Sequence, residues 1–184
     1  AIPGMRVYLP SDRHQTRKLF EALTCDEQTA YIRLGRNPVE DVYEEGCVPF
    51  EMNRATTLCE GTEVLLVACG EMVKPIQDAA RILNDRGIST GALDMYCVKP
   101  LDAETLLAAA RGKKLVVTAE EHAPFGGLGS MVAQVVSAND PRRVVNLALP
   151  DAPVITGTSK EVFRYYGLTG EGIAEKVQSL LKTC

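Results

Sequence analysis

The sequence predicts an α/β fold: a mostly parallel sheet with helices on both faces, preceded by a smaller βαβ unit. Two observations carry this prediction. The fully apolar run at residues 64–69 and the largely apolar run at residues 115–119 are typical of strands that helices cover on both faces. Helical periodicity follows each run, and this alternation of strands and helices favours parallel strands joined by right-handed crossovers.

The βαβ unit is predicted over residues 1–36. Residues 5–9 form its first strand, Asp12 is the expected N-cap of its helix with Gln15 in the capping-box position, and residues 31–34 form its second strand. Two strands and one helix bury too little surface to offset the conformational entropy lost on folding. The unit therefore has to pack against another part of the structure.

Residues 37–60 are predicted to link two domains. Regular periodicity fails in this segment, which combines two prolines and Gly46 with a cluster of four acidic residues between positions 40 and 45. A stretch of this length without a clear element is typical of a linker, although residues 47–52 have the composition of a short strand.

The remaining residues, 61–184, are predicted to form the main domain. Asp102 and Thr169 are expected to cap two of its helices. The predicted strands are residues 64–69, 88–98, 115–119 and 144–149, and the predicted helices are approximately residues 72–86, 103–110, 130–138, 159–166 and 170–181.

Composition and charge exclude several classes of protein. A formal net charge of −4 disfavours nucleic acid as the principal partner. No apolar run approaches the ~18 residues of a membrane span, and residues 1–6 lack the pattern of a signal peptide. The six cysteines include no CxxC pair, and the two histidines are far apart, which argues against a disulfide framework and a zinc site. We expect a cytoplasmic protein in which Cys69 and Cys97 are small buried apolar residues.

The residues that follow the predicted strand at 115–119 lie where ligands bind in parallel sheets. The glycine-rich residues 126–130 lead into a helix, so they provide either an anion site or, as we favour, close packing of that helix on the sheet. Glu120, Glu121 and His122 have the composition of an acid–base group. Adjacent residues that leave a strand point to opposite sides, so we expect these three to provide caps and interface hydrogen bonds instead.

Arg33 and Arg36 lie in a short basic segment at the end of the second predicted strand. A guanidinium group donates two parallel hydrogen bonds to a phosphate or carboxylate, so this segment is a candidate for binding a sugar phosphate. Ion pairs with the acidic residues at 40–45 explain the same arginines equally well.

The order of segments resembles one family over essentially the whole chain, the C-terminal section of transketolase-like thiamin diphosphate enzymes. The resemblance rests on the joint order and spacing of several stretches. These are YLPSD at 8–12 with TRK at 16–18, AYIRLGR at 30–36, residues 62–70, VKPLD at 98–102, TAEEH at 118–122, GGLGS at 126–130 and YGLT at 166–169. It implies that residues 1–36 are the C-terminal remnant of a pyrimidine-binding domain and that residues 61–184 are the transketolase C-terminal domain.

The resemblance also implies an activity for the full-length enzyme, the transfer of a two-carbon ketol unit between sugar phosphates with thiamin diphosphate and Mg²⁺. In the family, a glutamate of the pyrimidine domain activates the cofactor, and a Gly-Asp-Gly motif of a separate domain holds its diphosphate and the metal. This sequence contains no Gly-Asp-Gly, and the family's glutamate would lie upstream of Ala1.

We therefore expect the chain alone to carry no catalytic residue, to bind neither thiamin diphosphate nor Mg²⁺, and to be inactive. Its expected role is in the assembly of subunits, with a homodimer as the expected state. The resemblance implies that Arg36 is the arginine that binds the substrate phosphate, with Arg33 as the second choice.

Two alternatives stay open. 1-Deoxy-D-xylulose-5-phosphate synthase shares the Pro-Ser-Asp start and an Arg-x-x-Arg segment, here residues 33–36, although Glu-Glu-His before Gly-Gly-Leu-Gly favours transketolase. The other alternative is a non-catalytic assembly module that docks a partner, as in the β subunits of pyruvate dehydrogenase.

Overall fold

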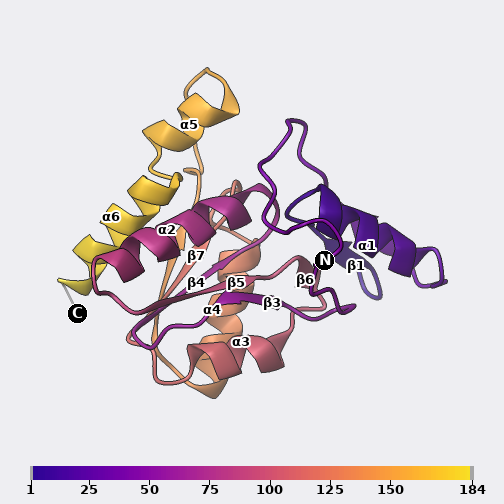
Figure 1. Cartoon of the computed structure of the whole chain (residues 1–184), viewed down its shortest axis with the longest axis horizontal. Coiled ribbons are helices and arrows are strands. Elements are labelled where there is room, and N and C mark those ends of the chain that lie inside the picture. The colour runs from indigo at the N-terminus through magenta and orange to yellow at the C-terminus, as the bar shows by residue number, and fades with distance from the viewer. Residues whose placement is uncertain (1, 183–184) are drawn as a thin grey trace.

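The computed structural model describes residues 2–182 and contains two sheets (Figure 1). The larger sheet has five strands in the order β3-β5-β4-β7-β8, and only β3 is antiparallel to its neighbour. Its strands are β3 (Thr56–Cys59), β4 (Val64–Ala68), β5 (Thr90–Asp94), β7 (Leu115–Ala119) and β8 (Arg143–Leu147). The predicted fold class, a mostly parallel sheet in an α/β fold, is confirmed.

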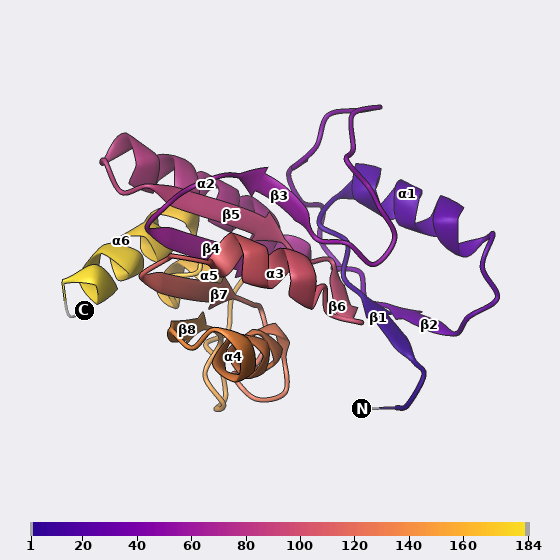
Figure 2. The ribbon, with the colours of Figure 1, turned by 90° about the horizontal axis from the view of Figure 1, so that it is seen from below.

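Helices cover both faces of this sheet (Figure 2). Side chains alternate along a strand, so Leu66 of β4 packs towards one helical layer while Leu65 and Val67 pack towards the other. The first layer contains α2 (Val73–Asp85), which follows the short 3₁₀ helix η1 (Gly70–Met72), and α6 (Gly170–Leu181). The second layer contains α3 (Ala103–Ala110) and α4 (Leu128–Asn139). The short helix α5 (Ser159–Tyr165) directly precedes α6 in the chain.

The N-terminal unit consists of β1 (Arg6–Tyr8), α1 (Arg13–Leu23) and β2 (Ala30–Ile32). It joins the rest of the chain through β6 (Cys97–Lys99), which pairs antiparallel with β1 in a sheet of order β2-β1-β6. The unit thus packs against the main domain, as its small size requires.

The single strand predicted at residues 88–98 is wrong, because the chain divides there into β5 and β6. Tyr96 lies between them and is fully buried. Its hydroxyl accepts from the Asn53 amide at 2.9 Å and donates to the Glu51 carbonyl at 2.8 Å. Its own carbonyl accepts from the Leu9 amide. These contacts direct the chain from the larger sheet to the smaller one. The apolar sequence of residues 88–98 does not indicate that β5 and β6 pair with strands of different sheets.

The short strand considered at residues 47–52 is absent from the structure, and residues 37–60 contain one strand further along. The strand is β3, which pairs with β5 at the edge of the larger sheet. Earlier in the segment, the amides of Val42 and Tyr43 both donate to Asp12 Oδ2 at 2.9 Å. The segment predicted as a linker is therefore tied to both sheets.

The predicted helix caps are confirmed at three helices. Asp12, Asp102 and Thr169 accept from the backbone amides of Gln15, Thr105 and Gly172. Cys69 and Cys97 are buried as expected, and the five cysteines within residues 2–182 are free thiols, while Cys184 lies outside the described residues. None of the helices in this part of the chain is long and apolar enough to cross a membrane.

Candidate functional site

Glu120 follows β7 and binds the N-terminus of α4. Its carboxylate accepts from the amides of Leu128 at 2.8 Å and Gly129 at 3.1 Å, and from Asn146 Nδ2 of β8 at 2.8 Å. Glu120 is only 4% exposed. The first amides of a helix attract negative charge, and here the chain's own carboxylate occupies that position. The anion site left open by the glycine-rich sequence is thus filled from within the protein.

Gly129 shows why this turn needs glycine. A Cβ at Gly129 would overlap the side-chain amide of Asn146, the same group that donates to Glu120. The first turn of α4 therefore approaches β8 more closely than any side chain would allow. The interpretation of the glycines as a device for close helix packing is confirmed.

Glu121 diverges from Glu120, whereas the Glu120 carboxylate and His122 Nδ1 both lie beside the backbone of Gly127. Glu121 pairs with Arg33 of the N-terminal unit. His122 is exposed, and its Nδ1 lies 2.6 Å from the carbonyl oxygen of Ala123. The expectation that these residues provide a cap and an interface hydrogen bond is confirmed for Glu120 and Glu121.

Arg33 lies between two carboxylates at the carboxyl end of the larger sheet. Burial alone would lower the pKa of Arg33, but the hydrogen bond with Glu121 raises it above its ordinary value. Glu71 of η1 is the second carboxylate: burial raises its pKa, Glu121 raises it further, and Arg33 lowers it. Arg33 therefore pairs with Glu121, and the predicted ion pair with the acidic residues at 40–45 is wrong for this arginine.

Arg36 lies three residues further along the same loop and is exposed. It has no hydrogen bond or ion pair with any residue in the range 2–182. Of the acidic residues at 40–45, Asp41 binds other groups: it accepts from Arg13 Nη2 at 2.8 Å and lies 3.3 Å from His14 Nε2. Of the two predicted arginines, Arg36 is the one whose guanidinium is free to meet an anion.

Asp94 forms a second polar cluster, which the sequence analysis missed. Its Oδ2 accepts from Ser11 Oγ at 2.9 Å, Gln15 Nε2 at 2.9 Å and the Tyr43 hydroxyl at 2.7 Å. Its Oδ1 is buried with no hydrogen-bond partner among the described residues. Burial raises the pKa of Asp94 to about 6, although the three hydrogen bonds oppose this shift. Asp94 thus joins the end of β5 to the N-terminal unit and to the segment that follows it.

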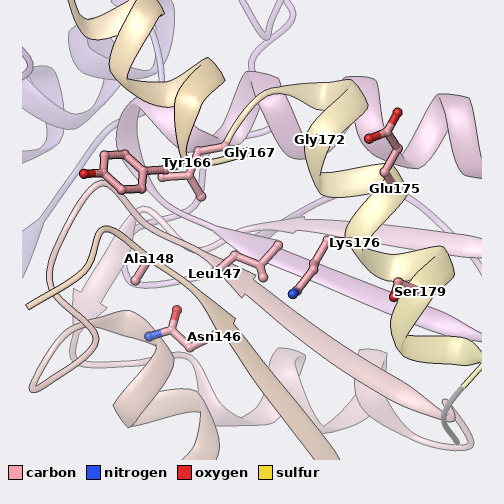
Figure 3. A pocket seen from close by; sticks show the side chains of 10 residues that line it. Asn146, Leu147, Ala148, Tyr166, Gly167, Gly172, Glu175, Lys176 and Ser179 are labelled. Carbon is pink, nitrogen blue, oxygen red and sulfur yellow. The ribbon is translucent and has the colours of Figure 1, made fainter. Parts of the chain in front are cut away.

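A cavity of about 450 Å³ lies between the end of β8 and α6 (Figure 3). The Lys176 amine points across it towards Leu147, whereas the Glu175 carboxylate points away. The other lining residues are Asn146, Ala148, Tyr166, Gly167, Leu168, Gly172 and Ser179. The lining of the cavity includes no residue of the Arg33–Arg36 loop.

The family model for "Transketolase, C-terminal domain" matches residues 53–173 of this chain. The chain belongs to this family. The match includes all strands of the larger sheet and the Glu120–Gly129 turn. The resemblance found in the sequence is therefore confirmed for the transketolase C-terminal domain.

Curated relatives of this transketolase-family chain are longer proteins. It is 40% identical over 181 residues to an apulose-4-phosphate transketolase subunit of Phocaeicola vulgatus, covering 98% of this chain and 58% of that protein. It is 33% identical over 184 residues to "Putative transketolase C-terminal section" of Methanocaldococcus jannaschii, covering 99% and 57%. It is also 36% identical to 1-deoxy-D-xylulose-5-phosphate synthase of Symbiobacterium thermophilum, over 98% of this chain and 28% of that enzyme.

A solved structure shares the fold over almost the whole chain. It is titled "Split gene transketolase, inactive beta4 tetramer", and it matches with a TM-score of 0.87 and 38% identity. The match covers 99% of this chain and 58% of that one. The chain thus spans a little over half the length of its transketolase-subunit relatives.

The donor groups of the chain do not fit the thiamin diphosphate and Mg²⁺ site that the family implies. The sequence has no Gly-Asp-Gly motif. Within residues 2–182, no three His, Cys, Asp or Glu side chains gather in a way that could hold a metal ion.

Proposed function

We propose that the chain is the C-terminal part of a transketolase-family enzyme whose assembled form transfers a two-carbon ketol unit between sugar phosphates. Support comes from the 40% identity to a protein named as a subunit of a transketolase and from the shared fold with a split-gene transketolase. In this proposal residues 1–36 are the remnant of a pyrimidine-binding domain and residues 61–184 the C-terminal domain. We also propose that the assembled enzyme is cytoplasmic and that it contains a homodimer of this chain.

In the assembled enzyme, thiamin diphosphate with Mg²⁺ would supply the carbanion chemistry of ketol transfer. Other parts of the enzyme hold this cofactor. The chain contributes substrate binding: Arg36, with Arg33 as the second candidate, binds the phosphate of the sugar. The observation that carries this assignment is the exposed Arg36 guanidinium, which is unpaired within residues 2–182 and lies beside an arginine already paired with Glu121.

The first test compares the isolated chain with the assembled enzyme. We expect no binding of thiamin diphosphate with Mg²⁺ to the isolated chain by isothermal titration calorimetry. Micromolar binding to the isolated chain would contradict the proposed division of roles. The assembled enzyme is the positive control, since it should bind the cofactor under the same conditions.

The second test separates ketol transfer from the synthase alternative, which the similarity to 1-deoxy-D-xylulose-5-phosphate synthase supports. The assembled enzyme is supplied with either a ketose phosphate or pyruvate as donor and an aldose phosphate as acceptor. We expect a new ketose phosphate from the first donor only. Release of CO₂ and formation of a deoxyketose phosphate from pyruvate would instead identify a synthase.

A non-catalytic assembly role is the second candidate. Residues 61–184 expose Phe125, Val154 and Tyr165, which are 72%, 44% and 68% accessible and provide apolar area for a partner. Deletion of residues 61–184 distinguishes this role. If assembly is the whole function, the deletion abolishes association of the subunits while the remaining ones still bind cofactor. The ketol-transfer proposal instead requires that single substitutions at Arg36 reduce catalysis without changing association.

A further inference from the structure

The loop that carries Arg36 is attached to the main domain on its N-terminal side. Arg33, directly after β2, forms an ion pair with Glu121, which follows β7. Two residues later, the backbone of Gly35 lies against the carboxylate of Glu71, so closely that a Cβ at Gly35 would overlap Glu71 Oε1. Both contacts join the N-terminal unit to the carboxyl end of the larger sheet.

The loop is also attached on the other side of Arg36. Asn37 Nδ2 donates to Ser159 Oγ at 2.9 Å, and Ser159 is the first residue of α5. Three separate elements of the main domain, the end of β7, η1 and α5, therefore contact Arg33, Gly35 and Asn37 on the two sides of Arg36. Arg36 is the one cation in this loop that has no partner in the described part of the chain.

We propose that Glu121 is a positioning residue for Arg36: through its ion pair with Arg33 it fixes the loop so that the Arg36 guanidinium meets the substrate phosphate. This inference rests on the proposed phosphate-binding role of Arg36. It gives the C-terminal domain a direct part in substrate binding, because the domain determines where a residue of the N-terminal unit is presented.

The exposures of the two partners fit this role. The Glu121 side chain is 17% exposed and that of Arg33 is 43% exposed, so the pair is partly shielded from water. Shielded charge pairs hold their geometry better than fully exposed pairs, which contribute little. A loop fixed before binding loses less conformational entropy when Arg36 contacts the phosphate, and this raises affinity for the phosphorylated substrate.

The inference is tested in the assembled enzyme with two acceptors, D-glyceraldehyde 3-phosphate and D-glyceraldehyde. The measured quantity is the phosphate preference, the kcat/KM for the first acceptor divided by the kcat/KM for the second. We expect Arg36→Gln to lower this preference about 10- to 100-fold, the range for loss of a charge-assisted hydrogen bond. Glu121→Gln should lower it about 5-fold through a higher KM for the phosphorylated acceptor, with kcat retained.

Glu104→Gln is the matched control, because Glu104 also pairs with an arginine, Arg54 at 2.7 Å, but on the exposed side of α3. It should leave the phosphate preference unchanged. Exchanging the pair, Arg33→Glu together with Glu121→Arg, should restore most of the preference lost in Glu121→Gln. An exchanged pair that stays as impaired as Glu121→Gln would show that Arg33 contacts the phosphate itself, and would overturn the positioning role.

The two levels of the proposal fail in different ways. If Arg36→Gln leaves the phosphate preference unchanged, the phosphate-binding role of Arg36 is wrong and the inference fails with it. If Arg36→Gln lowers the preference and Glu121→Gln does not, only the positioning role is wrong. Amide hydrogen exchange gives a readout without activity: Glu121→Gln should speed exchange at residues 34–37 and not at β7, and unchanged exchange at 34–37 would also overturn the inference.

Discussion

The centre of the larger sheet and the junction between the two sheets are built from different interactions. Leu65, Leu66 and Val67 of β4 are buried among apolar side chains on both faces of the sheet. At the junction, Tyr8 and Leu19 of the N-terminal unit also pack into an apolar cluster, and polar contacts are added to it, with Asp94 and Glu121 each binding groups from that unit. The apolar layers supply most of the folding free energy, whereas the polar contacts determine how the Arg36 loop is placed.

The largest difference between the two regions should appear when a leucine is truncated in each. Leu66 is fully buried on the central strand, and Leu66→Ala should lower the free energy of unfolding by about 4 kcal/mol, because it removes apolar contacts and leaves a cavity. Leu34→Ala at the exposed loop should change it by less than about 0.5 kcal/mol. Urea denaturation measures both, and equal losses would break the comparison.

The next largest effect concerns Asp94 and depends on pH. Its pKa in the folded chain is about 6, above its ordinary value, so the folded state binds this proton more tightly than the unfolded state. The contribution of Asp94 to stability therefore increases as pH falls from about 6 to about 4, by up to about 3 kcal/mol, and is lost as pH rises through 6. Asp94→Asn should remove this dependence.

The measurement is urea denaturation of the wild type and Asp94→Asn at pH 7 and pH 4.5. The stability of the wild type relative to the variant should be higher at pH 4.5. Asp151→Asn, on an exposed loop, reports the general effect of losing one carboxylate. A wild type that loses stability relative to Asp94→Asn on acidification would contradict the assignment of a raised pKa.

A smaller loss of stability is expected at Glu120. Its neighbour Glu121 allows a comparison between a buried and a partly exposed glutamate. Glu120→Gln replaces one carboxylate oxygen with an NH₂ group. The two oxygens of Glu120 accept from three donors, so at least one donor loses its partner. We expect a loss of about 2 kcal/mol in the free energy of unfolding. Glu121→Gln, at the partly exposed neighbour, should cost less than about 1 kcal/mol. A larger loss in the free energy of unfolding for Glu121→Gln than for Glu120→Gln would contradict the structural role assigned to Glu120.

The elements predicted correctly depend on local patterns. The apolar runs of β4 and β7 and the cap residues Asp12, Asp102 and Thr169 carry their signals within a few neighbouring residues. The division of residues 88–98 and the location of β3 were not predicted, because each depends on which distant strand supplies the hydrogen bonds. Tertiary context decides such pairings more strongly than composition does.

The candidate site was predictable in its residue types and not in its pairings. Glu120 and Glu121 were singled out because they follow a strand of the larger sheet, and Arg33 and Arg36 because they form a basic segment after a strand of the N-terminal unit. Which arginine is paired and which is free was not evident, because Arg33 and Glu121 are 88 positions apart. Asp94 was missed for the same reason: its partners Ser11, Gln15 and Tyr43 are distant in sequence.

The most direct measurement of the central claim is a crystal structure of the assembled enzyme with a sugar phosphate bound. The Arg36 guanidinium should lie within hydrogen-bonding distance of the phosphate oxygens, while Arg33 stays paired with Glu121. A phosphate bound away from this loop, or one held by Arg33 after its pair with Glu121 has broken, would contradict the account.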